Sequence, residues 1–256
     1  MEPIQIVLCG CSGHMGHVVA DCVRTRNDAQ ICAGIDLTDT VGGAFPVFQK
    51  PEDVTCHADV LIDFSHPSVL TSLLAYAAKH RVPAVLCSTG YSEAQLAQIR
   101  QASQEIPIFK SGNMSLGVNL LIELAKRAAS VLGEPFDIEI IEKHHNRKLD
   151  APSGTALMIA DGVSEVLPDP MTYTYDRHSR RMPRSKSEIG IHSVRGGTIV
   201  GEHEILFAGP QETISITHTA QSREIFALGA VNAAAFMAGK QEPGLYDMTD
   251  LLKSTQ

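Results

Sequence analysis

The N-terminal segment reads Ile4-Gln5-Ile6-Val7-Leu8-Cys9-Gly10-Cys11-Ser12-Gly13-His14-Met15-Gly16. Its apolar start predicts a strand, and residues 17–24 continue with helical apolar spacing. Glycines between a strand and a helix let the backbone approach a pyrophosphate at the helix N-terminus. The spacing Gly-x-x-Gly-x-x-Gly is a variant of the commoner fingerprint, so a plain strand–helix turn is the alternative. We expect dinucleotide contacts from Gly10, Cys11, Ser12, Gly13, His14 and Met15.

The next apolar run, residues 30–36, predicts a second strand that ends in Asp36, 20 positions after Gly16. A carboxylate at this place accepts hydrogen bonds from the adenine ribose hydroxyls. It also repels a 2′-phosphate, and Leu37-Thr38 supplies no arginine to hold one, which leaves His14 as the nearest candidate cation. We therefore expect NADH to be used at least as well as NADPH.

Strands and helices alternate through residue 115, which predicts a parallel, doubly wound sheet of the Rossmann type in an α/β fold. Ligands of such sheets bind beyond the carboxyl ends of the strands. Purely structural turns are the alternative for Gly90 and Gly112. The strand ends place these further candidate cofactor contacts on one rim: Phe64, Ser88, Thr89, Gly90, Ser111, Gly112, Asn113 and Met114.

The densest cluster of titratable groups is the segment 142–155, Glu-Lys-His-His-Asn-Arg-Lys-Leu-Asp-Ala-Pro-Ser-Gly-Thr. It follows an alternating run, residues 136–141, that predicts a strand with Asp137 and Glu139 on its opposite face. Its end opens an apolar helix over 156–166, which Ser153 or Thr155 caps. A helix N-terminus binds carboxylates, and histidines titrate near neutral pH. The segment therefore predicts a small anionic substrate, most simply a dicarboxylate, that is protonated during the reaction.

Two other interpretations of this segment compete with that one. A polar loop with two histidines is often only a solvated turn. A zinc site is disfavoured because neighbouring residues of a strand point to opposite faces and no cysteine lies nearby. We expect no metal.

The remaining sequence predicts a second domain of the α+β class. Residues 189–195, 198–207 and 212–219 alternate without helices between them, which indicates a mixed, open-faced sheet suited to a subunit interface. We interpret His192, His203 and His218 as structural or interfacial. An Ala-rich helix over 223–240 should pack back on the first domain. The expected division is 1–115 with 219–256 for dinucleotide binding, and 116–218 for substrate binding and oligomerisation.

Composition excludes several classes of protein. The 256 residues carry a net charge of −8, which argues against general nucleic-acid affinity. The basic stretch 177–186 then predicts a mobile loop near an anionic ligand or a subunit contact. No apolar run approaches the roughly 20 residues of a membrane span, and residues 1–4 show no signal-peptide pattern. Six cysteines in the first 87 residues read as buried free thiols, so we expect a cytoplasmic protein.

Several segments together resemble the 4-hydroxy-tetrahydrodipicolinate reductase (dihydrodipicolinate reductase) family. The block His144-His145-x-x-Lys148-x-Asp150-Ala-Pro-Ser-Gly-Thr155 is specific for that family, whereas the glycine turn is not. The resemblance spans nearly the whole chain and also includes residues 63–65, 88–90, 113–119, 194–197 and 218–223.

The resemblance implies an NADH- or NADPH-dependent reductase of a cyclic unsaturated dicarboxylate, in the diaminopimelate route to lysine. It implies two domains joined by hinges and a homotetramer held by the second domain's sheet. The family's general acid corresponds to His144, and its proton-donating, carboxylate-binding lysine to Lys148. His145 corresponds to a substrate contact, and Ser153-Gly154-Thr155 to the seat of the other carboxylate.

Two departures from the family pattern weaken the case for strict NADPH use. His14 stands where the family usually has arginine, and no basic residue follows Asp36. Ser88 replaces a usual threonine or glycine. The alternatives to this function are a cofactor-sensing binding protein and a reductase of another small oxo or imino acid.

Overall fold

The computed structural model describes residues 2–254; Met1, part of the stretch inspected for a signal, and residues 255–256 lie outside the described residues. The chain divides into two compact units, Met1–Ser115 with Glu224–Gln256, and Leu116–Arg223. The expected return to the first unit was at residue 219. Strand β11 (Thr213–Ala220) still pairs with its neighbour β10 through Ala220, so residues 219–223 stay with the second unit.

The first unit is built on a seven-stranded sheet in the order β12-β6-β5-β4-β1-β2-β3. Every pair in it is parallel, which confirms the Rossmann-type α/β prediction. The carboxyl ends of these strands consequently share one edge. The strands are β1 (Ile4–Cys9), β2 (Ala29–Ile35), β3 (Val47–Phe48), β4 (Val60–Asp63), β5 (Ala84–Leu86), β6 (Pro107–Lys110) and β12 (Gly244–Tyr246).

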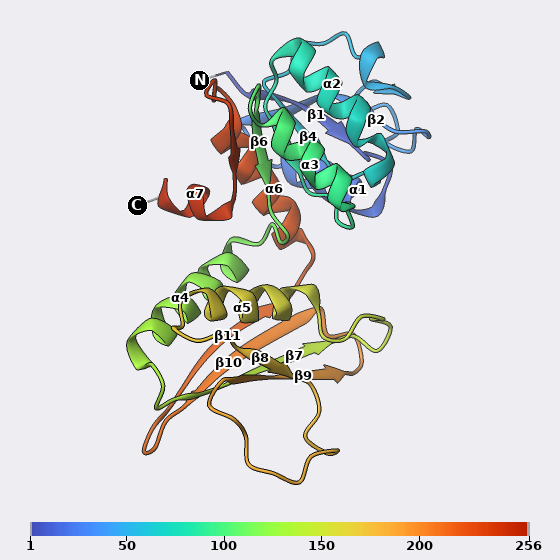
Figure 1. The fold of residues 1–256 in the computed structure, drawn as a ribbon. Coiled ribbons are helices and arrows are strands. Elements are labelled where there is room, and N and C mark those ends of the chain that lie inside the picture. The colour runs from blue at the N-terminus through green and yellow to red at the C-terminus, as the bar shows by residue number, and fades with distance from the viewer. Residues whose placement is uncertain (1, 255–256) are drawn as a thin grey trace. The chain divides into compact units, whose positions relative to one another are not determined.

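Helices cover both faces of this sheet (Figure 1). On one face, Leu73 and Leu74 of α2 and Ile99 of α3 join a core with Val7 and Leu61 of the strands. On the other face, α6 packs on α1 and on strands β4 and β5, as predicted for the Ala-rich helix. The helices are α1 (His14–Arg24), α2 (Leu70–His80), α3 (Glu93–Ala102), α6 (Glu224–Met237) and α7 (Met248–Lys253), with 3₁₀ turns at Pro51–Asp53 and Pro67–Val69.

The second unit has a five-stranded mixed sheet in the order β11-β10-β7-β9-β8. Strand β10 runs antiparallel to β7 and β11, while β7, β9 and β8 are parallel, which confirms the predicted mixed sheet. Helices α4 (Leu116–Leu132) and α5 (Gly154–Glu165) lie side by side on one face (Figure 1). The other strands are β7 (Asp137–His144), β8 (Thr172–Thr174), β9 (Glu188–Arg195) and β10 (Gly201–Ala208).

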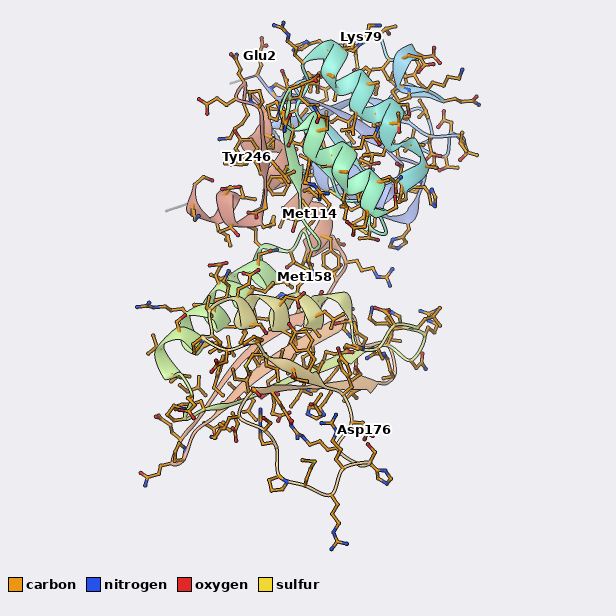
Figure 2. All side chains as sticks on the ribbon, in the orientation of Figure 1. Glu2, Lys79, Met114, Met158, Asp176 and Tyr246 are labelled. Atoms are coloured by element: carbon orange, nitrogen blue, oxygen red, sulfur yellow. The ribbon has the colours of Figure 1, made fainter. Side chains whose placement is uncertain are left out.

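The opposite, outer face of this sheet carries no helix within residues 2–254. The basic stretch begins after Asp176 (Figure 2), and two of its arginines bind a carboxylate of this sheet. Glu139 accepts hydrogen bonds from Arg177 at 2.7 Å and from Arg184 at 2.6 Å. A carboxylate of the chain itself thus neutralises two arginines of this stretch, and its proximity to an anionic ligand or a subunit contact stays a prediction.

The structure differs from the sequence predictions at some short elements. Strand β7 continues to His144, three residues beyond the predicted end. Strands β3, β8 and β12 were not predicted, because strands of two or three residues show no measurable alternation. The six-residue helix α7 was not predicted either. All six cysteines are free, but only Cys9, Cys11 and Cys87 are buried. No helix in the described part of the chain is long and apolar enough to cross a membrane.

Candidate active site

The glycine-rich turn between β1 and α1 is held close to the end of β4. Gly10 has a φ of 78°, and a Cβ there would lie 2.7 Å from the backbone of Phe64. A Cβ on Gly16 would lie 2.1 Å from the carbonyl oxygen of Gly10. Only glycine fits both places without a backbone shift. Helix α1 then begins at His14, with no side chain capping it, so its first N–H groups remain available to an anion.

Asp36 lies directly against this turn. Its Oδ2 atom accepts a hydrogen bond from the Ser12 backbone N–H at 3.0 Å. The Ser12 hydroxyl in turn donates to the carbonyl oxygen of Thr38 at 2.6 Å. The end of β2 and the glycine turn thus form one hydrogen-bonded unit with a carboxylate at its edge, and a dinucleotide ribose fits such an edge.

A cavity of about 440 Å³ opens at the carboxyl ends of the strands of the first unit. Gly10, Cys11, Ser12, Asp36 and Gly90 do not line it; the Cys11 side chain is buried against the position of Gly34, so only its backbone can face a ligand. The lining brings together these predicted residues: Gly13, His14, Met15, Phe64, Ser88, Thr89, Ser111, Gly112, Asn113 and Met114.

Beneath this cavity lies Asp63, a buried carboxylate that the sequence pattern did not single out as a site residue. Its two oxygens accept hydrogen bonds from the Ser65 backbone N–H at 2.9 Å, the Ser88 hydroxyl at 2.9 Å and the Tyr91 hydroxyl at 3.2 Å. Asp63 therefore fixes the ends of β4 and β5 against one another, and with them two segments that line the cavity.

The second unit holds a separate polar cluster around His144. Alternation along β7 places Glu142 and His144 on the helix-covered face and Lys143 on the outer face, where it pairs with Glu202. His144 is only 8% exposed. The strand, expected to end at residue 141, thus carries Lys143 and His144 as well and turns their side chains to opposite faces, so of these two only His144 lies in the cluster.

Glu142 is the centre of this cluster and is fully buried. Its Oε2 atom lies 2.5 Å from Nδ1 of His144 and 2.7 Å from Nη1 of Arg195. Its Oε1 atom accepts from Nη2 of Arg195 at 2.8 Å and from the Ser153 backbone N–H at 3.1 Å. Each carboxylate oxygen therefore has two donors, as a buried charge requires.

Ser153 links this carboxylate to helix α5 and to strand β10. Its hydroxyl caps α5 by accepting from the Ala156 N–H at 3.1 Å, as predicted, and pairs with Nε2 of His203 at 2.9 Å. The His203 ring packs edge-on against His144, with centroids 5.1 Å apart. His203, which was expected to be structural or interfacial, lies beside His144.

Lys148 and His145 follow in the loop after β7. The Lys148 ammonium group lies 2.8 Å from Oδ1 of Asp150, and the lysine side chain is 21% exposed. His145 is half-buried, and its Nδ1 atom is buried without a hydrogen-bond partner. This loop thus brings a cation and an imidazole to the start of α5, and such a set can hold carboxylates.

Burial and neighbouring charges set the protonation of this cluster. Burial raises the pKa of Glu142, but hydrogen bonds from Arg195, Ser193 and His144 outweigh it and bring the pKa down to about 2. Burial lowers the pKa of His144; the Glu142 carboxylate counteracts this, and Lys148 and Arg195 lower it again. Burial also lowers the pKa of His203 to about 4. At neutral pH the cluster therefore has an ionised Glu142 and a neutral His203.

No group of three or more His, Cys, Asp or Glu residues in the part of the chain that the structure describes is arranged to hold a metal ion. The two sites thus consist of a nucleotide-binding edge in one unit and an imidazole–carboxylate–cation cluster in the other.

Two protein-family models match the two units in turn. Dihydrodipicolinate reductase, N-terminus, matches residues 4–114, and dihydrodipicolinate reductase, C-terminus, matches residues 117–252. The chain belongs to the dihydrodipicolinate reductase family. As a reductase of this family it is an NAD(P)H-dependent oxidoreductase.

Close relatives named as reductases of this family match nearly the whole length of the chain. The 4-hydroxy-tetrahydrodipicolinate reductase of Caldanaerobacter subterraneus subsp. tengcongensis is 53% identical over 98% of both chains, and that of Clostridium tetani is 49% identical over 98% of both. The dipicolinate-bound dihydrodipicolinate reductase from Paenisporosarcina sp. TG-14 superimposes with a TM-score of 0.81 at 26% identity, covering 96% of this chain and 97% of that one.

Three neighbours of His144 in this reductase are not among the predicted site residues: Glu142, Arg195 and His203. Glu142 lies two residues before His144 on the same strand, so its alternating position was the available signal. Arg195 and His203 come from β9 and β10, and no pattern within 142–155 points to them.

Proposed function

We propose that this chain reduces 4-hydroxy-tetrahydrodipicolinate to tetrahydrodipicolinate with NADH or NADPH, in the diaminopimelate route to lysine. The observation that carries the proposal is the buried His144, paired through Nδ1 with Glu142 beside Lys148 and the capped start of α5. This set combines a proton donor with two places for a carboxylate, which a cyclic dicarboxylate substrate requires.

The residues of the first unit fit a nicotinamide dinucleotide. Gly10 and Gly16 leave the close backbone approach that a pyrophosphate needs, and the free N–H groups at the start of α1 face the same place. Asp36 would accept from the ribose hydroxyls, and Ser88, Thr89 and Asn113 would line the nicotinamide pocket. The cofactor, when bound, supplies the hydride. With Asp36 at the ribose edge and with His14, the candidate cation at the start of α1, exposed, we propose that NADH is used at least as well as NADPH.

The residues of the second unit handle the carboxylates and the proton. Lys148 and the N–H groups of Ser153, Gly154 and Thr155 would hold the two carboxylates, and His145 would contact the substrate. Loss of the 4-hydroxyl group as water leaves a conjugated C=C–C=N system, and hydride addition to it places negative charge on the ring. His144 would neutralise that charge by donating a proton, supported by Lys148. An arriving dianion also raises the pKa of His144, which favours the protonated form when substrate is present.

We further propose a cytoplasmic homotetramer held through the outer face of the second unit's sheet. No helix within residues 2–254 covers this face, and Val194 on it is 44% exposed. A sheet face that no helix covers is suited to a subunit interface. Light scattering coupled to gel filtration tests this: a particle of four times 27.6 kDa is expected, and a monomer at micromolar concentration contradicts it.

Oxidation of NADH and of NADPH, followed with substrate freshly made by the upstream synthase, tests the proposed function. Wild type is expected to oxidise both cofactors. His144→Gln should lower kcat by about 10²-fold or more, as expected for loss of a general acid, with cofactor affinity unchanged. His192→Gln is the matched control, because this histidine also pairs with a β7 carboxylate, Glu139, but on the outer face. A wild type that binds cofactor yet is inert with both would overturn the reductase assignment.

A further inference from the structure

The side chain of Glu142 is held by donors from three separate elements. His144 comes from β7 itself, Arg195 from β9, and the Ser153 N–H from the start of α5. Arg195 binds both oxygens of the carboxylate, at 2.7 and 2.8 Å. A bidentate arginine fixes the plane of the carboxylate as well as its position. The position of Oε2 beside Nδ1 of His144 is therefore fixed.

This arrangement determines which nitrogen of His144 carries the proton in the neutral ring. An ionised carboxylate only accepts hydrogen bonds, so the Nδ1 atom, 2.5 Å from Oε2, must be the protonated one. The Nε2 atom then bears the lone pair and is the atom that takes up and releases the second proton. A Cβ on Gly201 would lie 3.2 Å from Nε2, so the absence of a side chain at Gly201 leaves space beside that atom.

We propose that Glu142, locked by Arg195, is a positioning residue that fixes the tautomer and orientation of His144 so that Nε2 delivers the proton. This inference rests on the proposed role of His144 as the acid. Neither Glu142 nor Arg195 needs to touch the substrate. Arg195 also donates to the Asp150 carbonyl oxygen at 2.6 Å, so the same guanidinium ties the loop that carries Lys148 to the acid.

The charges around His144 predict in which direction its pKa changes when Glu142 is replaced. Glu142 on β7 favours the imidazolium, whereas Lys148 from the loop and Arg195 from β9 oppose it, and the neutral His203 from β10 packs on the ring. Removing the Glu142 charge leaves only the opposing groups and the burial. A general acid must be protonated, so activity falls as the pH rises through its pKa. In Glu142→Gln this fall should move to lower pH.

The experiment compares wild type with Glu142→Gln and with the control Glu139→Gln. Glu139 lies three residues earlier on the same strand, faces the other side, and also binds two arginines and a histidine. The first readout is the tautomer and pKa of the histidine rings, by long-range ¹H–¹⁵N NMR on the cofactor-free, substrate-free chain. The second is the pH profile of kcat/KM with freshly made substrate.

For wild type and Glu139→Gln we expect a His144 ring protonated at Nδ1. Glu142→Gln should mix the two tautomers, lower the pKa of His144, lower kcat at least tenfold and shift the basic limb of the pH profile downward. An unchanged tautomer and pH profile in Glu142→Gln, or the same changes in Glu139→Gln, would overturn the positioning role.

A second variant keeps the test decisive if Glu142→Gln does not fold. Glu142→Asp retains the charge and withdraws it from Nδ1 by one methylene, so the loss of tautomer preference should appear without the loss of charge. Unchanged NMR signals in this variant count against the proposal. The NMR readout needs no turnover, so an inert wild type would reject the proposed function alone, whereas an active wild type with an unresponsive tautomer would reject the positioning role alone.

Discussion

The carboxylate of Asp36 accepts a hydrogen bond from the backbone N–H of Ser12 at 3.0 Å. This hydrogen bond holds one carboxylate oxygen of Asp36, the residue that follows β2, against the glycine turn. A second negative charge brought to this edge, such as a 2′-phosphate, meets a fixed carboxylate, and His14, the candidate cation at the start of α1, is exposed.

Asp36→Asn should therefore shift cofactor preference toward NADPH. The amide removes the repulsion and accepts fewer hydrogen bonds from ribose hydroxyls. We expect the ratio of kcat/KM for NADPH to that for NADH to rise about tenfold, which corresponds to about 1.4 kcal/mol. Initial rates with both cofactors measure it. Asp39→Asn, an exposed carboxylate of the same loop, should leave the ratio unchanged; a similar rise there would assign the effect to general surface charge.

Replacing the two lysines of segment 142–155 should have different effects on the kinetic constants. Lys148 lies in the loop beside Asp150, whereas Lys143 is bound to Glu202 on the outer face. Lys148→Met should raise KM for the dicarboxylate and lower kcat by at least tenfold, because one carboxylate loses its cation and the acid loses its support. Lys143→Met should keep both constants near wild type per active site. Steady-state kinetics at saturating NADH decides, and equal losses in both variants would contradict the assignment of Lys148.

Space beside Nε2 of His144 depends on Gly201. In Gly201→Ala the new methyl group would lie 3.2 Å from that nitrogen, closer than ordinary van der Waals contact. We expect kcat to fall several-fold while NADH affinity, measured by fluorescence titration, stays constant. Gly196→Ala is the control, since a Cβ there meets nothing within 4 Å and its φ is not positive. Full activity in Gly201→Ala would show that the proton does not leave from this side of the ring.

Acid should destabilise the second unit through His203. Burial lowers the pKa of His203 to about 4, so the unfolded chain binds this proton more tightly than the folded one between about pH 6.5 and 4. The free energy of unfolding therefore falls as the pH drops through that window. The contribution of this one histidine is about 2 kcal/mol between pH 7 and pH 5.

His203→Gln should remove that part of the pH dependence, because a glutamine can still donate to the Ser153 hydroxyl but does not titrate. Urea denaturation of both proteins at pH 7 and pH 5, followed by circular dichroism, measures the difference. His57→Gln changes a histidine whose side chain is 82% exposed and should retain the wild-type dependence. An equal loss of stability on acidification in wild type and His203→Gln would contradict the role assigned to burial.

Much of the molecule follows from patterns confined to one stretch of sequence. The strand, the glycines and Asp36 are close in sequence, so their spacing alone predicted a dinucleotide-binding turn. The alternation of strands and helices predicted the parallel sheet. Ser153 was one of two predicted caps, with Thr155, because capping involves residues three positions apart. In each case the interacting residues lie within one or two adjacent elements, where local geometry sets the contacts.

The surroundings of His144 were decided by the tertiary structure. Ser193 of β9 and His203 of β10 are the register partners of Glu142 on the two strands that pair with β7. A shift of one residue in either pairing would turn Arg195 or His203 to the other face of the sheet. The sequence by itself determined which chemical groups the chain carries and which local turns and caps it forms. Strand register, which depends on packing across the whole second unit, decided which of those groups meet at the acid.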